Sequence, residues 1–239
     1  LQQGIELGLS LIDTAEMYAE GGAEDVVGQA IAGRRDQVFL VSKVYPHNAG
    51  RRSMAAACER SLTRLGTDCI DLYLLHWRGQ HPLEETVEAF EHLREQGKIK
   101  RWGVSNFDVD DLRELHNPDC ATNQVLYNPA QRGIEFDLLP WCEKRALPTM
   151  AYCPLAQAGR LLQHPVLAEI AERHGATPAQ VSLAWVTRND GVIAIPKAVA
   201  PEHVRLNAAA GALTLNSEDL RAIDRAFPAP TRKQRLAMV

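Results

Sequence analysis

The sequence has no apolar run that approaches the roughly 20 residues of a membrane-spanning helix. It also lacks an excess of basic residues, because 26 Lys and Arg stand against 30 Asp and Glu and give a formal net charge of −4. A positive field that would attract nucleic acid or an anionic membrane is therefore missing. Both features argue against membrane and nucleic-acid partners.

The chain also lacks a cysteine framework. Its cysteines are an odd number, are scattered and form no C-x-x-C pair, which is typical of reduced thiols in a cytosolic protein. No spacing among them resembles a zinc site. We therefore expect a cytoplasmic protein without a metal. The five are Cys58, Cys69, Cys120, Cys142 and Cys153.

The remaining composition is that of an ordinary globular protein. Of 239 residues, 46% are hydrophobic and 23% are charged, which provides ample apolar material for one large core. No linker, low-complexity tract or short repeat interrupts the chain. We expect a single domain over residues 1–239, and a monomer.

Short apolar runs recur at the spacing of βα units of about 30 residues. Between them lie amphipathic helical patterns, of which three end on Gly33, Gly66 and Gly97 and one begins with Thr177 as its N-cap. The alternation predicts an α/β fold of parallel strands. Strands are expected near residues 9–13, 38–42, 69–75, 101–104, 122–126, 148–152 and 192–195.

Seven strands are one fewer than a closed eight-stranded barrel needs, and a gap would leave two strand edges unpaired. The sequence begins with LQQGIELGLSLIDTA, a helical pattern without Met and without a preceding strand. We therefore expect that this chain lacks the native first strand and the start of the first helix. Eight parallel strands formed by these residues alone would contradict that expectation.

Polar residues stand at the ends of three predicted strands. Asp13, Lys43 and His76 close the runs LSLID, VFLVSK and CIDLYLLH, and Tyr18 follows Asp13 shortly afterwards. Parallel α/β barrels bring such strand ends to one common face, where their chemistry takes place. We therefore expect these four side chains to converge.

An aspartate, a lysine, a tyrosine and a histidine form a proton-transfer set. A free tyrosine is a weak acid that titrates near ~10, but a cation ~4 Å away stabilises its anion by ~4 kcal/mol at an effective dielectric near 20. Lys43 beside Tyr18 is therefore sufficient to make Tyr18 a proton donor. Asp13 would hold Lys43 charged and oriented, and His76 would direct a substrate carbonyl.

Each of these residues has an ordinary explanation when taken alone. Tyr18 could be a rim tyrosine, Lys43 a solvated strand end and His76 a structural histidine, while Asp13 could cap the following turn. Their combination on consecutive strand ends favours chemistry, chiefly because of the resemblance described next.

The chain resembles the aldo-keto reductase superfamily. The likeness rests on IDTAEMYAEGGAEDVVGQAI, FLVSKV, DLYLLHW, GKIKRWGVSNF, NQVLYNP, MAYCPL and IPKA, which follow in the same order and cover nearly the whole sequence. It implies a (β/α)8 barrel and hydride transfer from NADPH to an aldehyde or ketone. It also implies Tyr18 as general acid, with Asp13, Lys43 and His76 completing the tetrad. LLHWRG and WGVSNFD resemble bacterial members that reduce small aldehydes such as methylglyoxal.

The same resemblance implies a set of cofactor-binding residues. The chain has no G-x-G-x-x-G motif, so a Rossmann mode of dinucleotide binding is not expected. Ser105, Asn106 and Gln124 would bond the nicotinamide carboxamide, and Tyr152 would stack on its ring. The remaining positions that the resemblance implies are Pro154, Leu155, Ile195, Lys197, His203 and Asn207.

The residues expected around the 2′-phosphate depart from the family pattern. Lys197 matches the lysine of the family, but Ala198 stands for a usual serine and His203 for a usual arginine. Arg205 lies on a different face of the expected helix, and Leu206 replaces an acidic residue. We expect NADPH because Lys197 keeps a positive charge there, and NADH stays open.

Tyr45, Trp77 and Phe107 follow strand ends and are expected to line the substrate pocket, with packing beneath the loops as the alternative. Two other functions stay open. The chain could be a nucleotide-binding regulator, or an inactive truncated relative, with negligible turnover. It could also be a lyase in which Lys43 forms a Schiff base.

Overall fold

The computed structural model describes all 239 residues, which divide into two compact units, Leu1–Asn123 and Gln124–Val239. The seven strands are parallel where their pairing is described, and their order in the sheet follows the chain from β1 to β7. None of the helices combines the length and the apolar composition that a membrane crossing requires.

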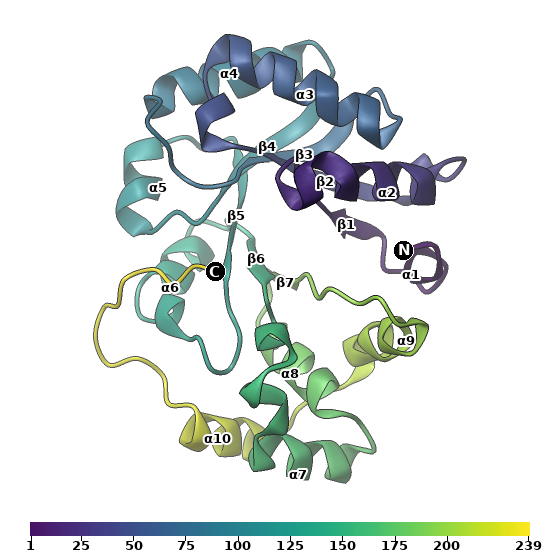
Figure 1. Cartoon of the computed structure of the whole chain (residues 1–239). Helices are drawn as coiled ribbons and strands as arrows, with labels where there is room; N and C mark the ends of the chain where they lie inside the picture. Colours follow the sequence, from purple (N-terminus) through teal and green to yellow (C-terminus); the bar gives the residue numbers. More distant parts are fainter. The chain divides into compact units, whose positions relative to one another are not determined.

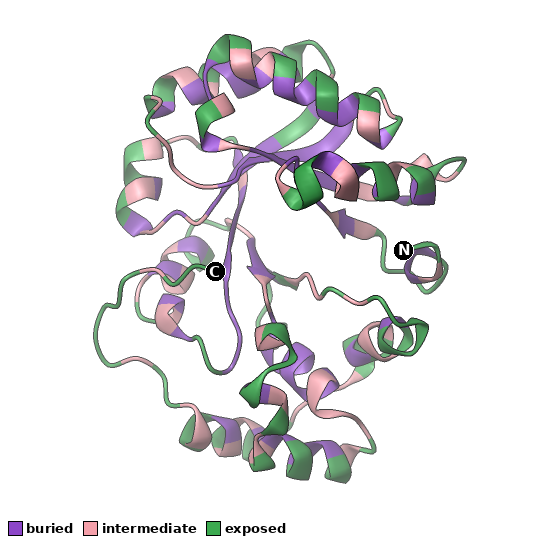
Figure 2. Ribbon diagram, in the orientation of Figure 1, coloured by how far each residue is buried: buried purple, intermediate pink, exposed green.

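The first unit is built from βα repeats (Figure 1). Its strands alternate with helices that pack over them, and the strands Phe39–Val44 and Ile70–Leu75 are almost completely buried (Figure 2). Its elements are α1 (Gln2–Glu6), β1 (Leu11–Asp13), α2 (Gly22–Ile31), β2 (Phe39–Val44), α3 (Arg51–Leu65), β3 (Ile70–Leu75), α4 (Leu83–Glu95), β4 (Ile99–Ser105) and α5 (Val109–Leu115). Strand β5 (Cys120–Leu126) carries the chain across the boundary into the second unit.

The second unit contains two further strands, which pair in parallel through Met150 and Ile193. Helix α8 is buried on nearly all sides and contacts α7 and α9. The elements are α6 (Leu138–Glu143), β6 (Thr149–Tyr152), α7 (Pro165–His174), α8 (Pro178–Val186), β7 (Val192–Ala194), α9 (Pro201–Ala209) and α10 (Ser217–Ala226).

The seven predicted strands are confirmed, and their ends differ from the predictions by only a few residues. The predicted helix stops are confirmed at Gly66 and Gly97, which follow α3 and α4 with positive φ. Thr177 caps α8 through a capping box with Gln180. Local sequence signals therefore determine where most of these elements begin and end.

Two contacts show why the helices of the first unit lie where they do. A Cβ on Gly28 would come within 2.5 Å of the Arg64 carbonyl oxygen, so only glycine permits this close approach of α2 and α3. Glu24 of α2 is fully buried and accepts from Ser42 of β2 and from Arg64 of α3. These bonds satisfy a carboxylate that could not otherwise be buried.

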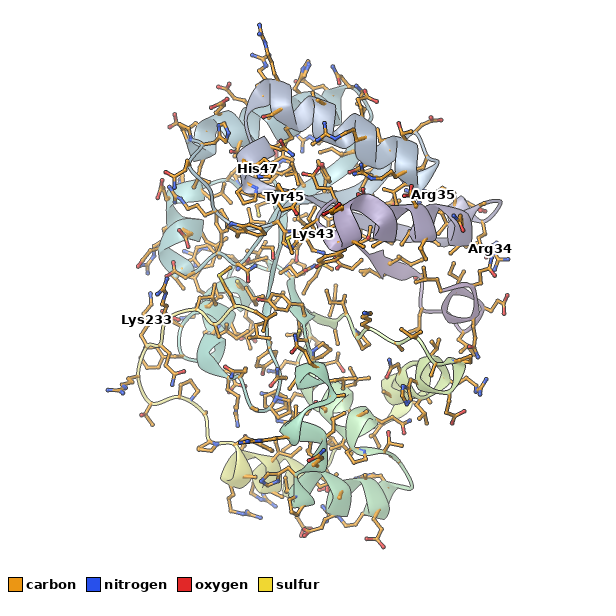
Figure 3. The ribbon with its side chains drawn as sticks, viewed as in Figure 1. Arg34, Arg35, Lys43, Tyr45, His47 and Lys233 are labelled. Carbon is orange, nitrogen blue, oxygen red and sulfur yellow. The ribbon has the colours of Figure 1, made fainter.

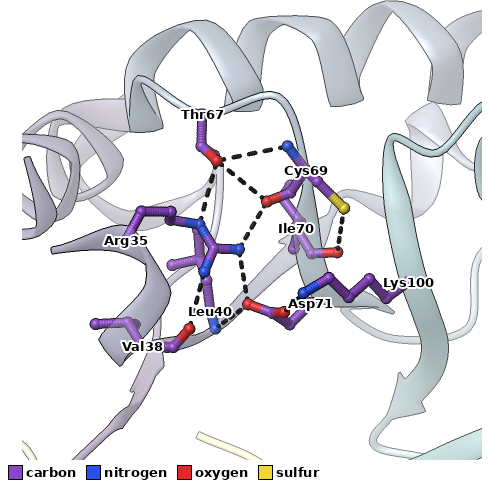
Figure 4. A network of polar contacts seen from close by, with 8 residues as sticks. All are labelled: Arg35, Val38, Leu40, Thr67, Cys69, Ile70, Asp71 and Lys100. Carbon is purple, nitrogen blue, oxygen red and sulfur yellow. Dashed lines mark hydrogen bonds and ion pairs between the residues drawn. The ribbon is translucent and has the colours of Figure 1, made fainter. Parts of the chain in front are cut away.

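The starts of β2, β3 and β4 are joined by a polar network around Asp71 (Figure 4). Asp71 Oδ2 accepts from Arg35 at 2.6 Å and from the Leu40 amide at 2.9 Å, and Oδ1 accepts from Lys100 at 2.6 Å. Arg35 also donates to the carbonyl oxygens of Val38 and Cys69. The network fixes the ends of the strands opposite to Lys43 and His76.

Candidate active site

The parallel register of the first unit brings the polar strand ends together. Asp13 ends β1, Lys43 lies on β2 and His76 directly follows β3. The ladder continues past the strands, because the amides of Glu16 and His76 donate to the carbonyls of Lys43 and Val44. Lys43 lies with Tyr45 and His47 toward the carboxyl end of β2, whereas Arg35 precedes that strand (Figure 3).

Lys43 is buried completely, and its ammonium is surrounded by oxygen atoms. Nζ lies 2.6 Å from Asp13 Oδ2, 2.9 Å from the Thr14 carbonyl oxygen and 3.3 Å from Tyr18 Oη. A lysine without exposed surface is tolerated only where such partners compensate for its lost hydration. The predicted ion pair with Asp13 and the predicted neighbourhood of Tyr18 are both present.

Tyr18 lies just beyond β1, in the short 3₁₀ turn Tyr18–Gly21. Its ring is 36% exposed, while Lys43 Nζ lies 4.8 Å from the ring centroid. The phenol therefore meets a buried cation on one side and keeps accessible surface on the other. A reacting molecule can reach this side chain, although Lys43 itself is sealed off.

His76 lies beside Tyr18, with ring centroids 5.6 Å apart in an edge-to-face arrangement. Burial, and after it the positive charge of Lys43, lowers the pKa of His76 from its ordinary value of 6.5 to about 3. The imidazole is therefore neutral at neutral pH, and its buried Nδ1 has no hydrogen-bond partner. A neutral imidazole still carries one N–H that can donate to a substrate oxygen.

Two of the three predicted substrate residues form an aromatic wall. Tyr45 lies edge-to-face against Trp77, with ring centroids 6.0 Å apart. The ring centroids of Trp77 and His76 are 5.0 Å apart. Phe107 is 0% exposed. Its burial favours the alternative of packing beneath the loops, because a substrate could reach this ring only after a movement.

Ser105 and Asn106 lie at the end of β4. Asn106 adopts a left-handed conformation with φ of 60°, and its Nδ2 donates to the His76 carbonyl oxygen and to Ser105 Oγ, both at 3.2 Å. The amide thus ties the end of β4 to the end of β3. Non-glycine residues with this backbone strain are concentrated at ligand sites.

The other predicted cofactor residues belong to the second unit. Gln124 is buried on β5, and Tyr152 ends β6 and is half-buried. The Pro154 carbonyl accepts from Ser182 Oγ at 2.8 Å. After Leu155 the chain passes through three successive left-handed residues, at positions 156–158.

The remaining candidates follow β7. The Ile195 amide donates to the Ala151 carbonyl and continues the ladder with β6. Lys197 and His203 are exposed and Asn207 is half-buried. Arg205 pairs with Glu202 at 2.8 Å within the same helix.

One buried residue among these side chains was not predicted. Glu16 lies between Asp13 and Tyr18 in sequence and is only 7% exposed. The available signal was an acidic residue within the segment that leaves β1, but nothing in the sequence indicates its partners. In addition, no group of three or more His, Cys, Asp or Glu residues is arranged to hold a metal ion.

Comparison with known proteins identifies the family. Residues 1–227 match the aldo/keto reductase family. The chain is 58% identical to methylglyoxal reductase YeaE of Escherichia coli (strain K12) over 247 aligned positions, covering 100% of this chain and 87% of that protein. It is 37% identical to the glyoxal reductase of Bacillus subtilis (strain 168), covering 94% of this chain and 81% of that protein.

A crystal structure of an aldo-keto reductase from Klebsiella pneumoniae in complex with NADPH superposes with a TM-score of 0.99. The two chains are 60% identical, and the match covers 100% of this chain and 87% of the other. The predicted fold class, an α/β fold of the (β/α)8 barrel type, is confirmed by this likeness. The chain belongs to the aldo/keto reductase family and is therefore an oxidoreductase.

Proposed function

We propose that this enzyme reduces the carbonyl group of small aldehydes, ketones and α-dicarbonyls, with methylglyoxal as a representative substrate, to the corresponding alcohols. The proposal is supported by relatives named methylglyoxal reductase and glyoxal reductase. NADPH is the proposed coenzyme, and a structural relative with 60% identity binds it.

The observation that carries this proposal is the position of the Lys43 ammonium, 3.3 Å from the Tyr18 hydroxyl. A positive charge at that distance favours the phenolate that remains after proton donation, and the Asp13 carboxylate on the same ammonium offsets part of this effect. Tyr18 is therefore placed to donate a proton from its accessible side, with the ammonium of Lys43 beside its hydroxyl. Asp13 holds the ammonium in place through the 2.6 Å ion pair.

The chemistry requires two donors at the carbonyl oxygen. NADPH, when bound, supplies the hydride that reduces the carbonyl carbon. Tyr18 donates the proton that the oxygen then needs, and His76 donates a hydrogen bond that fixes the direction of the carbonyl. Because His76 is neutral at neutral pH, it orients the substrate and does not compete with Tyr18 as the acid.

The second unit contains residues that fit NADPH. Lys197 is an exposed cation, as a 2′-phosphate would require. The left-handed residues at positions 156–158 turn successive amides in a segment that the family resemblance associates with the pyrophosphate. Tyr152 at the end of β6 would offer a ring face to the nicotinamide.

The Schiff-base alternative is less compatible with the geometry. A lyase lysine must expose a neutral amine to its substrate. Lys43 has no exposed surface, and its Nζ already bonds Asp13 and the Thr14 carbonyl. Borohydride treatment with methylglyoxal is therefore expected to leave Lys43 unmodified.

Replacement of Tyr18 by phenylalanine tests the proposal. Tyr18→Phe should lower kcat with methylglyoxal at least about 100-fold, which is the lower range for loss of a general acid. NADPH affinity, measured by fluorescence titration, should stay within about two-fold of wild type.

Tyr73→Phe is the matched control, because it removes the hydroxyl of a fully buried tyrosine that does not belong to the candidate site. This variant should keep wild-type turnover. Retention of turnover in Tyr18→Phe would remove the basis for Tyr18 as the acid.

A further inference from the structure

Glu16 connects the loop after β1, which carries Tyr18, to the turn after β2, which carries Tyr45. Its Oε1 accepts from the Tyr45 amide at 2.8 Å and from Asn48 Nδ2 at 3.0 Å. Its own amide donates to the Lys43 carbonyl at 3.2 Å. The residue is thus bonded to β2 and to the turn that follows β2, although it belongs to the loop after β1.

The two hydrogen bonds that Glu16 Oε1 accepts are short. Distances of 2.8 and 3.0 Å to a carboxylate oxygen are those of strong, charge-assisted hydrogen bonds. The carboxylate is nearly buried, so water cannot replace a lost donor at low cost. Arg60, whose side chain is half exposed, approaches the other oxygen at 3.6 Å and contributes less.

The side chains around the site form a closed series of contacts. The ring centroids of Tyr18 and His76 lie 5.6 Å apart. Those of His76 and Trp77 lie 5.0 Å apart, and those of Trp77 and Tyr45 lie 6.0 Å apart. The Tyr45 amide then bonds Glu16, which precedes Tyr18 by two residues. The distance between the proton donor and the aromatic wall is therefore fixed from both sides, and Glu16 provides the only polar bond described between the Tyr45 backbone and the loop after β1.

We propose that Glu16 is a positioning residue that sets the width of the substrate site between Tyr18 and Tyr45. This inference rests on the proposed function, because it concerns how that site holds a carbonyl compound. A small substrate makes few contacts, so its orientation depends on walls placed to within a fraction of an ångström. Glu16 itself touches neither the substrate nor Lys43 Nζ, and it acts through the Tyr45 backbone.

The test compares three substitutions of Glu16 with wild type. Glu16→Ala removes the acceptor, and Glu16→Asp shortens it so that it no longer reaches the Tyr45 amide. Both should raise KM for methylglyoxal about ten-fold, while kcat stays within about three-fold and the pH profile of kcat is unchanged. Glu16→Gln keeps an acceptor oxygen and should restore KM to within about three-fold of wild type.

Two further readouts separate positioning from general destabilisation. NADPH affinity should be the same in all variants, because the bonds of Glu16 reach none of the predicted cofactor residues. Hydrogen exchange at the Tyr45 amide should be faster in Glu16→Ala and Glu16→Asp than in wild type. Arg60→Met, which removes only the long contact, should leave both KM and this exchange rate unchanged.

A wild-type KM in Glu16→Asp, or a Gln variant as impaired as Ala, would overturn the inference. A loss confined to kcat or to the folded fraction would also overturn it. If wild type showed no turnover of methylglyoxal, the proposed function would fail instead. The exchange rate of the Tyr45 amide would then still decide whether Glu16 positions this loop.

Discussion

Lys43 is the residue through which Asp13 and Tyr18 of the candidate site are brought together. It has no exposed surface, and its Nζ bonds Asp13 and the Thr14 carbonyl oxygen and lies beside the Tyr18 hydroxyl. Removal of one partner would leave an uncompensated buried charge, which costs several kcal/mol. The same bonds that compensate for the burial of Lys43 also hold its ammonium beside the Tyr18 hydroxyl.

His76 provides a test at the residue scale through pH. The folded state keeps it neutral to about pH 3, whereas an unfolded chain takes up a proton as the pH falls through 6.5. The free energy of unfolding therefore falls on acidification, by up to about 1.4 kcal/mol per pH unit from this residue. Above pH 6.5 both states are neutral and the effect vanishes.

We predict that His76→Gln removes this dependence. Urea unfolding at pH 7, 6 and 5 should show the variant losing less stability than wild type on acidification, because other acidic groups titrate equally in both proteins. Parallel stability curves for the two proteins would show that the pKa of His76 is not lowered.

The proximity of Asp13, Tyr18, Lys43 and His76 could be predicted from the ends of the apolar runs together with the family resemblance. An apolar run that stops at a polar residue marks both the element and the side chain. Glu16 could not be predicted, because its importance lies in a bond to the Tyr45 backbone and no local pattern specifies that partner. Phe107 resembled a pocket residue by its place after Asn106, and only the three-dimensional packing reveals its complete burial.

The positions of the helices and strands could be predicted from the sequence more completely than the contacts within the candidate site. All strands were predicted from apolar runs, and Gly66, Gly97 and Thr177 marked helix ends. The contacts that join the elements were not predictable. In the sequence, Asp71 is only a polar residue within a predicted strand. Its bonds to Arg35, Leu40 and Lys100 depend on how the strands are aligned with one another, which the sequence does not specify.

The Asp71 network makes a prediction at the element scale. Asp71→Ala removes the carboxylate that accepts from Arg35, from the Leu40 amide and from Lys100, so the free energy of unfolding should fall by about 3 kcal/mol. Since Asp71 lies at the start of β3 and His76 follows its end, the kcat of correctly folded protein should change less than two-fold. Chemical denaturation measures the first quantity and steady-state kinetics the second.

A surface pair supplies the comparison for Asp71. Asp119→Ala breaks an exposed contact with Arg94 and should cost no more than about 0.5 kcal/mol. Similar losses for the two variants would mean that the network around Asp71 contributes little to stability.

At the scale of the whole molecule, the chemistry and the coenzyme candidates are distributed between the two units. The tetrad lies entirely in the first unit, and most of the predicted cofactor residues lie in the second. The α/β class could be predicted from the βα alternation, and the family resemblance implied the barrel type. The single domain over residues 1–239 and the roles of the individual cofactor residues stay predictions.

Lys197 provides the test at this scale. If it neutralises the 2′-phosphate of NADPH, Lys197→Ala should raise KM for NADPH about ten-fold, equivalent to about 1.4 kcal/mol, and leave KM for NADH within two-fold. Lys144→Ala removes another exposed lysine of the second unit and should change neither value. An equal loss with both coenzymes would show that Lys197 does not distinguish them.

The most direct measurement is a single turnover of NADPH with excess methylglyoxal, followed by coenzyme absorbance in a stopped-flow instrument. Wild type should oxidise its bound NADPH rapidly, and Tyr18→Phe should do so at least about 100-fold more slowly. Equal rates in the two proteins would contradict Tyr18 as the proton donor activated by Lys43. A slow wild-type turnover would indicate a nucleotide-binding regulator instead.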